Sequence, residues 1–395
     1  MDARTGLPVV GMVGAGQLAR MTQQAAIALG QSLHVLAETP DDGAALVVAD
    51  VTVGDYRSLD DLRAFAKGCD VVTFDHEHVP NDHIATLVAE GHSVHPGPDA
   101  LLYAQDKALM RERLAKLGVP VPRWRRVASE DDLATFGAEV GWPVVVKAAR
   151  GGYDGKGVWV AESPDDAADV LASGTPLLVE ERVPIVRELA VDLARSPFGQ
   201  GAVWPVVETV QAGGICVEVI APAPNLGDEL AEEAELIALR IAAELGVTGV
   251  LAVELFEVSP ADARPTDEFS GRLVVNELAM RPHNSAHWTI EGSRTSQFEQ
   301  HLRAVLDYPL GSTGRTAPVV VMANLLGGPD DVTPPIDERV HHCMATWPDV
   351  KIHLYGKGFR PGRKVGHVTA LGDDLDTVRA RARASAAYLM NGDDA

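Results

Sequence analysis

The stretch Val144-Val-Val-Lys147-Ala-Ala-Arg-Gly151-Gly152-Tyr153-Asp154-Gly155-Lys156-Gly157 joins a short apolar strand, which ends in a lysine, to a loop rich in glycine. A lysine beside the backbone N–H groups of such a loop is suited to holding the phosphates of a nucleotide. A lysine at a strand end can also simply extend its ammonium group into water. The stretch therefore predicts a nucleotide site only if other residues support it.

Two later strands supply that support, because each carries a glutamate among apolar residues. They read Val250-Leu-Ala-Val-Glu254-Leu-Phe256 and Leu273-Val-Val-Asn276-Glu277-Leu-Ala279. Burying a carboxylate is unfavourable unless a cation compensates for the lost water. Mg²⁺ binds through a few carboxylates together with substrate phosphates. We therefore expect phosphoryl transfer, with Glu254 and Glu277 as the metal ligands.

Composition and charge exclude several classes of protein. The 395 residues carry 34 basic and 56 acidic side chains, a net charge of −22, whereas nucleic acids and anionic membranes require a basic surface. The cysteines Cys69, Cys216 and Cys343 are far apart and form no CxxC motif, which favours reduced thiols in the cytoplasm. The first residues hold no long apolar run, and no stretch approaches 18 apolar residues, so we expect no signal peptide and no membrane span.

Alternating strands and helices in the first hundred residues predict a Rossmann-like parallel sheet. The expected strands there are 9–13, 33–38 and 71–74, with helices at 16–29 and from about 81, and one long helix follows at 99–117. We predict three domains: an N-terminal domain at 1–104, a central domain at 105–310 that includes a small mobile lid at about 121–187, and a C-terminal domain at 311–395. Later elements are expected at 228–245 (helix), 319–325, 352–355 and 365–370 (strands) and 374–389 (helix).

One motif favours a different function. Gly14-Ala-Gly16-Gln17-Leu-Ala19 matches the dinucleotide fingerprint, and Glu38 follows Gly16 at the end of the next strand. An NAD-dependent oxidoreductase is therefore one alternative. The same residues could instead form a tight turn, or a helix N-terminus that holds a substrate phosphate or ribose. The nucleotide features downstream, which dehydrogenation does not need, disfavour NAD.

The chain resembles the ATP-grasp superfamily over nearly its whole length, and within it the N5-carboxyaminoimidazole ribonucleotide synthases of purine biosynthesis. The resemblance rests on the fingerprint, on the glycine loop and on two long motifs. These read Asn276-Glu277-Leu-Ala-Met-Arg281-Pro-His283-Asn284-Ser285-Ala-His287-Trp288 and Arg360-Pro-Gly-Arg363-Lys364-Val-Gly366-His367. It implies an α/β protein with the ATP-grasp fold, in which the lid, an antiparallel central sheet and a small β-rich C-terminal domain follow the Rossmann-like domain.

The resemblance also implies a reaction and a homodimer. ATP phosphorylates bicarbonate to carboxyphosphate, and the amino group of aminoimidazole ribonucleotide is then carboxylated, releasing ADP and phosphate. Mg²⁺, with two ions expected beside bound ATP, would bind Glu254 and Glu277. ATP would contact Lys107, Lys147, Gly152, Gly155, Lys156, Glu180, Val183 and Glu188. Arg281, His283 and Asn284 would position bicarbonate, with Asp154 as proton acceptor, and the ribonucleotide would contact Gln17, Asp75, Glu77, Tyr153, Lys357, Arg363 and Lys364.

The sequence departs from the family pattern at three places, the smallest being Met280 where a proline is common. Thr209 and Gln211 stand in a stretch that usually reads Glu-Asn-x-His, and Asp75 replaces a glutamate. The roles of these residues stay open. Alternatives to the synthase are a formate-using transformylase of the same superfamily, the oxidoreductase, and a regulatory protein that binds a nucleotide without turning it over.

Overall fold

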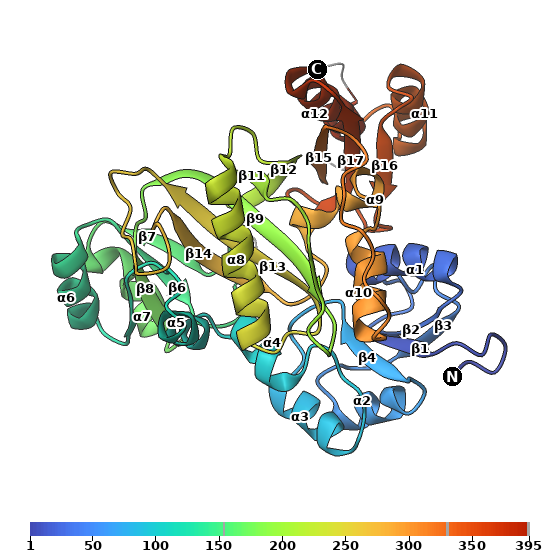
Figure 1. The fold of residues 1–395 in the computed structure, drawn as a ribbon, viewed down its shortest axis with the longest axis horizontal. Helices are drawn as coiled ribbons and strands as arrows, with labels where there is room; N and C mark the ends of the chain where they lie inside the picture. The colour runs from blue at the N-terminus through green and yellow to red at the C-terminus, as the bar shows by residue number, and fades with distance from the viewer. Residues whose placement is uncertain (153–154, 329–331, 393–395) are drawn as a thin grey trace.

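Three β-sheets organise the residues that the computed structural model describes, namely 1–152, 155–328 and 332–392 (Figure 1). The N-terminal part lies at one end of the molecule, the lid (green in Figure 1) at another, and the long central sheet runs between them towards the C-terminal helices. Tyr153 and Asp154, which the sequence places in the site, lie outside the described residues.

The N-terminal sheet is parallel throughout, as the sequence predicts, with the strand order β3-β2-β1-β4. Its strands are β1 (Val9–Val13), β2 (Ser32–Ala37), β3 (Asp50–Val53) and β4 (Val71–Phe74), and its helices are α1 (Gln17–Leu29), α2 (Leu59–Ala66) and α3 (Asn81–Ala89). Strand β3 and helix α2 are not predicted from the sequence. The four residues of β3 form a half-exposed edge strand, so they carry little of the apolar alternation that marks a strand.

The single helix expected at 99–117 is wrong. The structure has α4 (Pro98–Gln105) and α5 (Lys107–Lys116), because Asp106 is extended (φ −133°, ψ 105°). Its carboxylate accepts the backbone N–H groups of Ala108 and Leu109 and so caps α5. The break places Lys107 at the first position of α5.

The lid is an antiparallel sheet in the order β5-β8-β6-β7 with helices on one side. Its apolar cluster includes Leu133, Phe136, Val146 and Val179, so the lid has a core of its own. The elements are β5 (Trp124–Val127), α6 (Glu130–Val140), β6 (Val144–Ala148), β7 (Val158–Ala161), η1 (Pro164–Ala167), α7 (Ala168–Ala172) and β8 (Leu177–Glu181).

The central sheet has nine strands among the described residues, in the order β14-β13-β9-β11-β12-β15-β17-β16, with β10 beside β9. The strands are β9 (Ile185–Arg195), β10 (Gly201–Val203), β11 (Val207–Ala212), β12 (Ile215–Ala221), β13 (Gly249–Val258), β14 (Leu273–Ala279), β15 (Val319–Leu326), β16 (Lys351–Leu354) and β17 (Lys364–Gly372). Thus β15 to β17, which the sequence assigns to a separate domain, continue the same sheet. The remaining elements are α8 (Asp228–Glu244), η2 (Asn284–Ala286), α9 (Thr289–Gly292), α10 (Gln297–Val305), α11 (Ile336–Thr346) and α12 (Leu375–Asn391).

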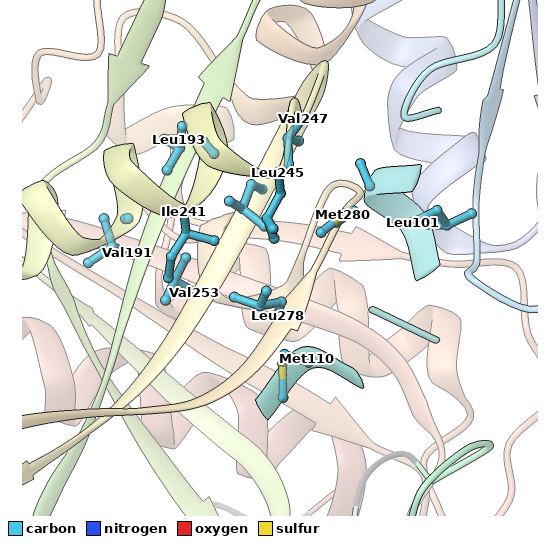
Figure 2. Packing of buried hydrophobic residues seen from close by; sticks show 14 of the residues in the cluster. Leu101, Met110, Val191, Leu193, Ile241, Leu245, Val247, Val253, Leu278 and Met280 are labelled. Carbon is cyan, nitrogen blue, oxygen red and sulfur yellow. The ribbon is translucent and has the colours of Figure 1, made fainter. Parts of the chain in front are cut away.

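The largest apolar cluster fixes the strands that carry the candidate site. Figure 2 shows Ile241 of α8 packed near Val191 and Val253 of the central sheet, and Leu278 of β14 near Met110 of α5. A second cluster joins Phe298 and Leu302 of α10 to the N-terminal sheet. Among the described residues no helix is both long and apolar enough to cross a membrane.

Candidate functional site

The two predicted metal ligands lie directly opposite each other. Glu254 of β13 pairs in register with Glu277 of β14, which confirms that the two strands are neighbours. Burial, reinforced by the charges of Glu277 and Glu188, raises the pKa of Glu254 to about 7. Lys107 forms a close ion pair with Glu277. Two crowded carboxylates next to one lysine form a pocket whose chemistry suits a hard divalent cation.

No group of three or more histidine, cysteine, aspartate or glutamate side chains in the described ranges is arranged to hold a metal by itself. A cation at Glu254 and Glu277 would therefore need further oxygen ligands. Phosphate oxygens and water are the partners that Mg²⁺ usually takes in such sites. The donor set fits a metal that arrives with a nucleotide.

The lid contributes a buried cluster of charges around Glu180 of β8. Lys147 of β6 lies 2.7 Å from one Glu180 oxygen, and Arg111 of α5 lies 2.7 Å from the other. Burial alone would raise the pKa of Glu180, but Arg111 and Lys147 outweigh it and hold that pKa at about 2. Lys147 also donates to the Asn276 side chain at 3.1 Å, next to Glu277. The cluster thus connects the lid to β14, the strand that carries Glu277.

Arg111 is a member of this cluster that the sequence analysis missed. Besides binding Glu180, it donates to the backbone oxygen of Asn276 at 2.7 Å, and its side chain is fully buried. It stands four residues after Lys107, so both side chains lie on one face of α5. That spacing could have identified it, but only with the helix break at Asp106 already known.

The other predicted nucleotide residues line the hinge between lid and central sheet. Val183 packs with Val258 and Val274 beside the last residues of β8. Glu188 of β9 is half-buried; its partial burial raises the pKa of its carboxyl group, while the charge of Lys147 opposes the shift. Thr209, where the family pattern is broken, pairs in register with Glu188.

The glycine loop approaches the turn between β11 and β12. A side chain at Gly155 (φ +76°) would come within 3.4 Å of the Gly214 backbone, and one at Gly152 would lie 2.8 Å from the Lys156 carbonyl oxygen. At Gly152 a side chain would therefore collide with the backbone, and at Gly155 the positive φ favours glycine. A side chain at Gly152 would also lie 3.8 Å from Lys107, the lysine paired with Glu277, so the start of the loop reaches this ion pair.

The segment after β14 brings the predicted bicarbonate residues near Glu254. His283 Nε2 lies 3.5 Å from Glu254 Oε1, and Arg281 Nε lies 3.5 Å from Glu77 Oε2. Glu77 also accepts the Met280 backbone N–H at 2.7 Å. The side-chain amide of Asn284 exchanges two hydrogen bonds with that of Asn324, at 3.0 and 2.7 Å. Asn284 thus fixes this segment to β15.

A second residue that the sequence analysis missed is Asp192 of β9. The Ser285 hydroxyl oxygen lies 2.8 and 3.0 Å from its two carboxyl oxygens and 2.8 Å from Nδ1 of His283. The backbone of His283 is held by Gln297, which accepts its N–H and donates to its carbonyl oxygen. No sequence signal links Asp192 to Ser285, because the two residues are 93 positions apart.

The predicted ribonucleotide residues meet where the N-terminal and C-terminal parts of the chain touch. Lys357 Nζ donates to the Gln17 side-chain oxygen at 2.7 Å. Lys364, at the start of β17, is close enough for its charge to oppose the raised pKa of Glu254. Arg363 donates to the backbone oxygen of Gly358 at 3.3 Å.

The fingerprint loop is filled by the protein itself. Asp75, at the end of β4, accepts the backbone N–H groups of Gly16 at 3.0 Å and Ala19 at 2.7 Å. A side chain at Gly14 would lie 2.8 Å from the Asp75 side chain, and one at Gly16 would lie 2.5 Å from it. The pyrophosphate of a dinucleotide needs these same N–H groups. The geometry therefore disfavours the NAD alternative, and contact of Asp75 with a substrate stays a prediction.

Comparisons with known proteins match this architecture along the chain. Three family models match: a ribonucleotide synthetase preATP-grasp domain at residues 7–105, an ATP-grasp domain at 112–298 and a phosphoribosylaminoimidazole carboxylase C-terminal domain at 320–381. The N5-carboxyaminoimidazole ribonucleotide synthase of Mycobacterium tuberculosis is 57% identical over 389 residues, which span 98% of this chain and 88% of that protein.

Solved structures agree with the sequence relatives. The N5-carboxyaminoimidazole ribonucleotide synthetase of Thermus thermophilus superposes with a TM-score of 0.84 at 35% identity, covering 97% of this chain and 99% of that one. The Aspergillus clavatus synthase, solved with ADP and 5-aminoimidazole ribonucleotide, gives 0.86 at 31% identity, covering 97% and 98%. The predicted fold class is confirmed. The chain belongs to the family of N5-carboxyaminoimidazole ribonucleotide synthases, which are ATP-dependent ligases built on the ATP-grasp fold.

Proposed function

We propose that this ligase carboxylates the amino group of 5-aminoimidazole ribonucleotide with bicarbonate, through carboxyphosphate, and releases ADP and phosphate. The observation that carries the proposal is the register pairing of Glu254 with Glu277, with Lys107 beside them. Phosphoryl transfer depends on positioning and on neutralising charge more than on covalent help from the protein. A carboxylate pair flanked by lysines provides both.

Glu254 and Glu277 would hold Mg²⁺, with two ions expected beside bound ATP. When bound, the metal would neutralise charge on the nucleotide phosphates. Lys107 and Lys147 would hold the phosphates from the lid side, and Gly152, Gly155 and Lys156 would cover them. Glu180 and Val183 would contact adenine, and Glu188 the ribose. The ion pairs of Lys107 with Glu277 and of Lys147 with Glu180 support this assignment, as does the packing of Val183 against the central sheet.

Bicarbonate would lie between Arg281 and His283, near Glu254. A guanidinium group can bind a planar carboxylate-like anion with two parallel hydrogen bonds. Carboxyphosphate reacts readily with water, so the site must be shielded while it exists. The lid, whose glycine loop already contacts the β11–β12 turn, is placed to do this.

The ribonucleotide would bind on the side of Gln17 and Lys357. Arg363 and Lys364 would neutralise its phosphate, and Asp75 and Glu77 would lie near its ribose and amine. The 2.7 Å contact between Lys357 and Gln17 supports a shared pocket at this junction. Tyr153 and Asp154 complete the proposed set, and we assign Asp154 the role of accepting the proton that the amine loses.

One assay separates this function from its alternatives. ADP release is measured with ATP and Mg²⁺ while bicarbonate, formate and the ribonucleotide are supplied in every combination. We expect release that needs both bicarbonate and the ribonucleotide. Release with formate would indicate a transformylase, binding of ATP without turnover a regulatory protein, and micromolar affinity for NAD⁺ an oxidoreductase.

We further propose that the enzyme works in the cytoplasm as a homodimer. The described cysteines are all free thiols, as a reducing compartment requires. The subunit number is checked by sedimentation equilibrium over a range of concentrations.

A further inference from the structure

Asp192 is a buried acid that lacks a cation. It is 2% exposed, and no ion pair found within the described ranges includes it. Burial, helped by the charge of Glu254 and opposed by Ser285, raises the pKa of Asp192 to about 7. Glu180 is equally buried but has Arg111 and Lys147 as partners. An acid without such partners is costly to bury as an anion, so the neutral form is favoured.

The hydrogen bonds around His283 identify which ring nitrogen carries the proton. The backbone nitrogen of Ser285 lies 3.4 Å from Nδ1 of His283 with its hydrogen directed at the ring. A backbone N–H can only donate, so Nδ1 must be an acceptor. The ring is neutral, because an imidazolium ion would carry a proton on both nitrogens and Nδ1 carries none. Its one proton is therefore on Nε2.

The same reasoning extends from His283 to Asp192. The Ser285 hydroxyl oxygen lies 2.8 Å from Nδ1, where two facing lone pairs would repel, so the hydroxyl donates to Nδ1. The hydroxyl has no second proton to give to Asp192, although the carboxyl oxygens are 2.8 and 3.0 Å away. Asp192 must then donate to Ser285, which requires its protonated form. Asp192 then donates to Ser285 and Ser285 donates to His283, so each of the three side chains has a hydrogen-bond partner.

We propose that Asp192 and Ser285 are positioning residues that hold His283 as a neutral hydrogen-bond donor facing the bicarbonate site. Nε2 is the ring atom that points toward Glu254, at 3.5 Å. An N–H group attracts an anion such as bicarbonate, whereas a bare nitrogen lone pair would repel it. The inference rests on the proposed function, because it assumes that bicarbonate binds next to His283.

Kinetics of four variants test the positioning role. Ser285→Ala and Asp192→Leu each remove one link, and we expect kcat/KM for bicarbonate to fall about tenfold in either, with KM for ATP unchanged. The double variant should be no worse than the worse single one, because both break the same chain of bonds. Asp192→Asn, whose amide can still donate to Ser285, should recover most of what Asp192→Leu loses.

Ser293→Ala is the matched control. This serine is also buried and also accepts a side-chain hydrogen bond, from Trp204, but it lies away from His283. Its removal should leave bicarbonate kinetics unaffected. If Asp192→Leu fails to fold, Ser285→Ala alone carries the kinetic test, since it removes a single oxygen. Unchanged bicarbonate kinetics in Ser285→Ala would overturn the proposal.

The position of the ring proton is measured independently of turnover. ¹⁵N-histidine labelling and two-dimensional NMR of the full chain, with His283 assigned by its loss in His283→Asn, should show the Nε2–H tautomer in the wild type and in Asp192→Asn. A proton on Nδ1 in the wild type would overturn the assignment, because it would require an ionised Asp192. If bicarbonate stimulates no ADP release at all, the proposed function fails, while the NMR result still decides the tautomer.

Discussion

At the scale of single residues, the surroundings of a buried carboxyl group decide its charge. Glu180 and Asp192 are both 2% exposed. Two cations keep the pKa of Glu180 at about 2, whereas burial without a cation raises that of Asp192 to about 7. The two pKa shifts have opposite signs. At neutral pH the ionised Glu180 therefore stabilises the folded state, whereas Asp192 destabilises it.

Asp192→Asn should therefore stabilise the protein in a pH-dependent way. Below about pH 4 the folded and unfolded states both hold the Asp192 proton, so the acid makes no difference. Between the ordinary value of 3.8 and the folded value of about 7 only the unfolded state loses it, so the acid progressively destabilises the fold. We expect the gain in Tm of Asp192→Asn to be larger at pH 8 than at pH 4.5, measured by calorimetry. An equal gain at both values would contradict the raised pKa.

Glu277→Gln should leave the fold intact and lower turnover by about 100-fold or more, because a neutral amide cannot offset the charge of Mg²⁺. ADP release across a Mg²⁺ titration measures the effect. Glu232→Gln, on the exposed side of α8, is the control and should behave as the wild type does. Normal turnover of Glu277→Gln at ordinary Mg²⁺ would remove this residue from the proposed ligands.

How far the sequence predicts residues depends on how local their partners are. Glu254 and Glu277 could be identified because each breaks the apolar pattern of its own strand, and their pairing follows from neighbouring strands. Arg111 and Asp192 could not, because each looks ordinary in its own segment. Their importance arises from partners on other elements, Glu180 and Ser285, which only the folded chain brings together.

At the scale of elements, the interruption between α4 and α5 sets the position of Lys107. Apolar periodicity alone predicts one helix, since both pieces keep their buried faces. The competing influence is Asp106, which favours capping over continuing a helix. The same periodicity predicted α8 well, because Gly227 precedes this helix and Gly246 follows it.

Asp106→Ala should cost about 1 kcal/mol of stability through the lost cap and should also weaken ATP binding, because Lys107 begins the capped turn. Differential scanning calorimetry and a titration with the nucleotide measure the two effects. Asp106→Asn is the matched control, since asparagine caps equally well while losing the ion pair with the exposed Arg150. Equal losses in both variants would show that the ion pair, and not the cap, is responsible.

At the scale of the whole molecule, the site is assembled from parts of the chain that the sequence order separates. The predicted boundary after residue 310 stays a prediction, but β15 to β17 share a sheet with Glu254 and Glu277. Helix α10 packs on the N-terminal sheet, and Lys357 reaches Gln17 across 340 positions. Apolar periodicity predicts where a strand lies in the sequence but not which strand pairs with it. The continuous sheet could therefore not be predicted.

Lys357→Met should raise KM for the ribonucleotide at least about tenfold and leave KM for ATP unchanged, because the lysine lies at the junction with Gln17 and away from Glu180. Steady-state kinetics with each substrate varied in turn measure the difference. Lys351→Met removes an exposed lysine at the start of β16 and should change neither constant. A parallel rise in both constants for Lys357→Met would place the residue elsewhere in the mechanism.

The shared sheet also shapes how the chain can be synthesised. Strand β12 ends at Ala221 and its neighbour β15 begins at Val319, so 319 − 221 = 98 residues must be translated before that edge is covered. At about 5–20 residues per second, the edge of β12 that faces β15 stays unpaired for roughly 5–20 s, while β11 pairs with the other edge. An open strand edge readily recruits other chains. The nascent polypeptide therefore exposes one strand edge to other chains for several seconds, until β15 is made and pairs with it.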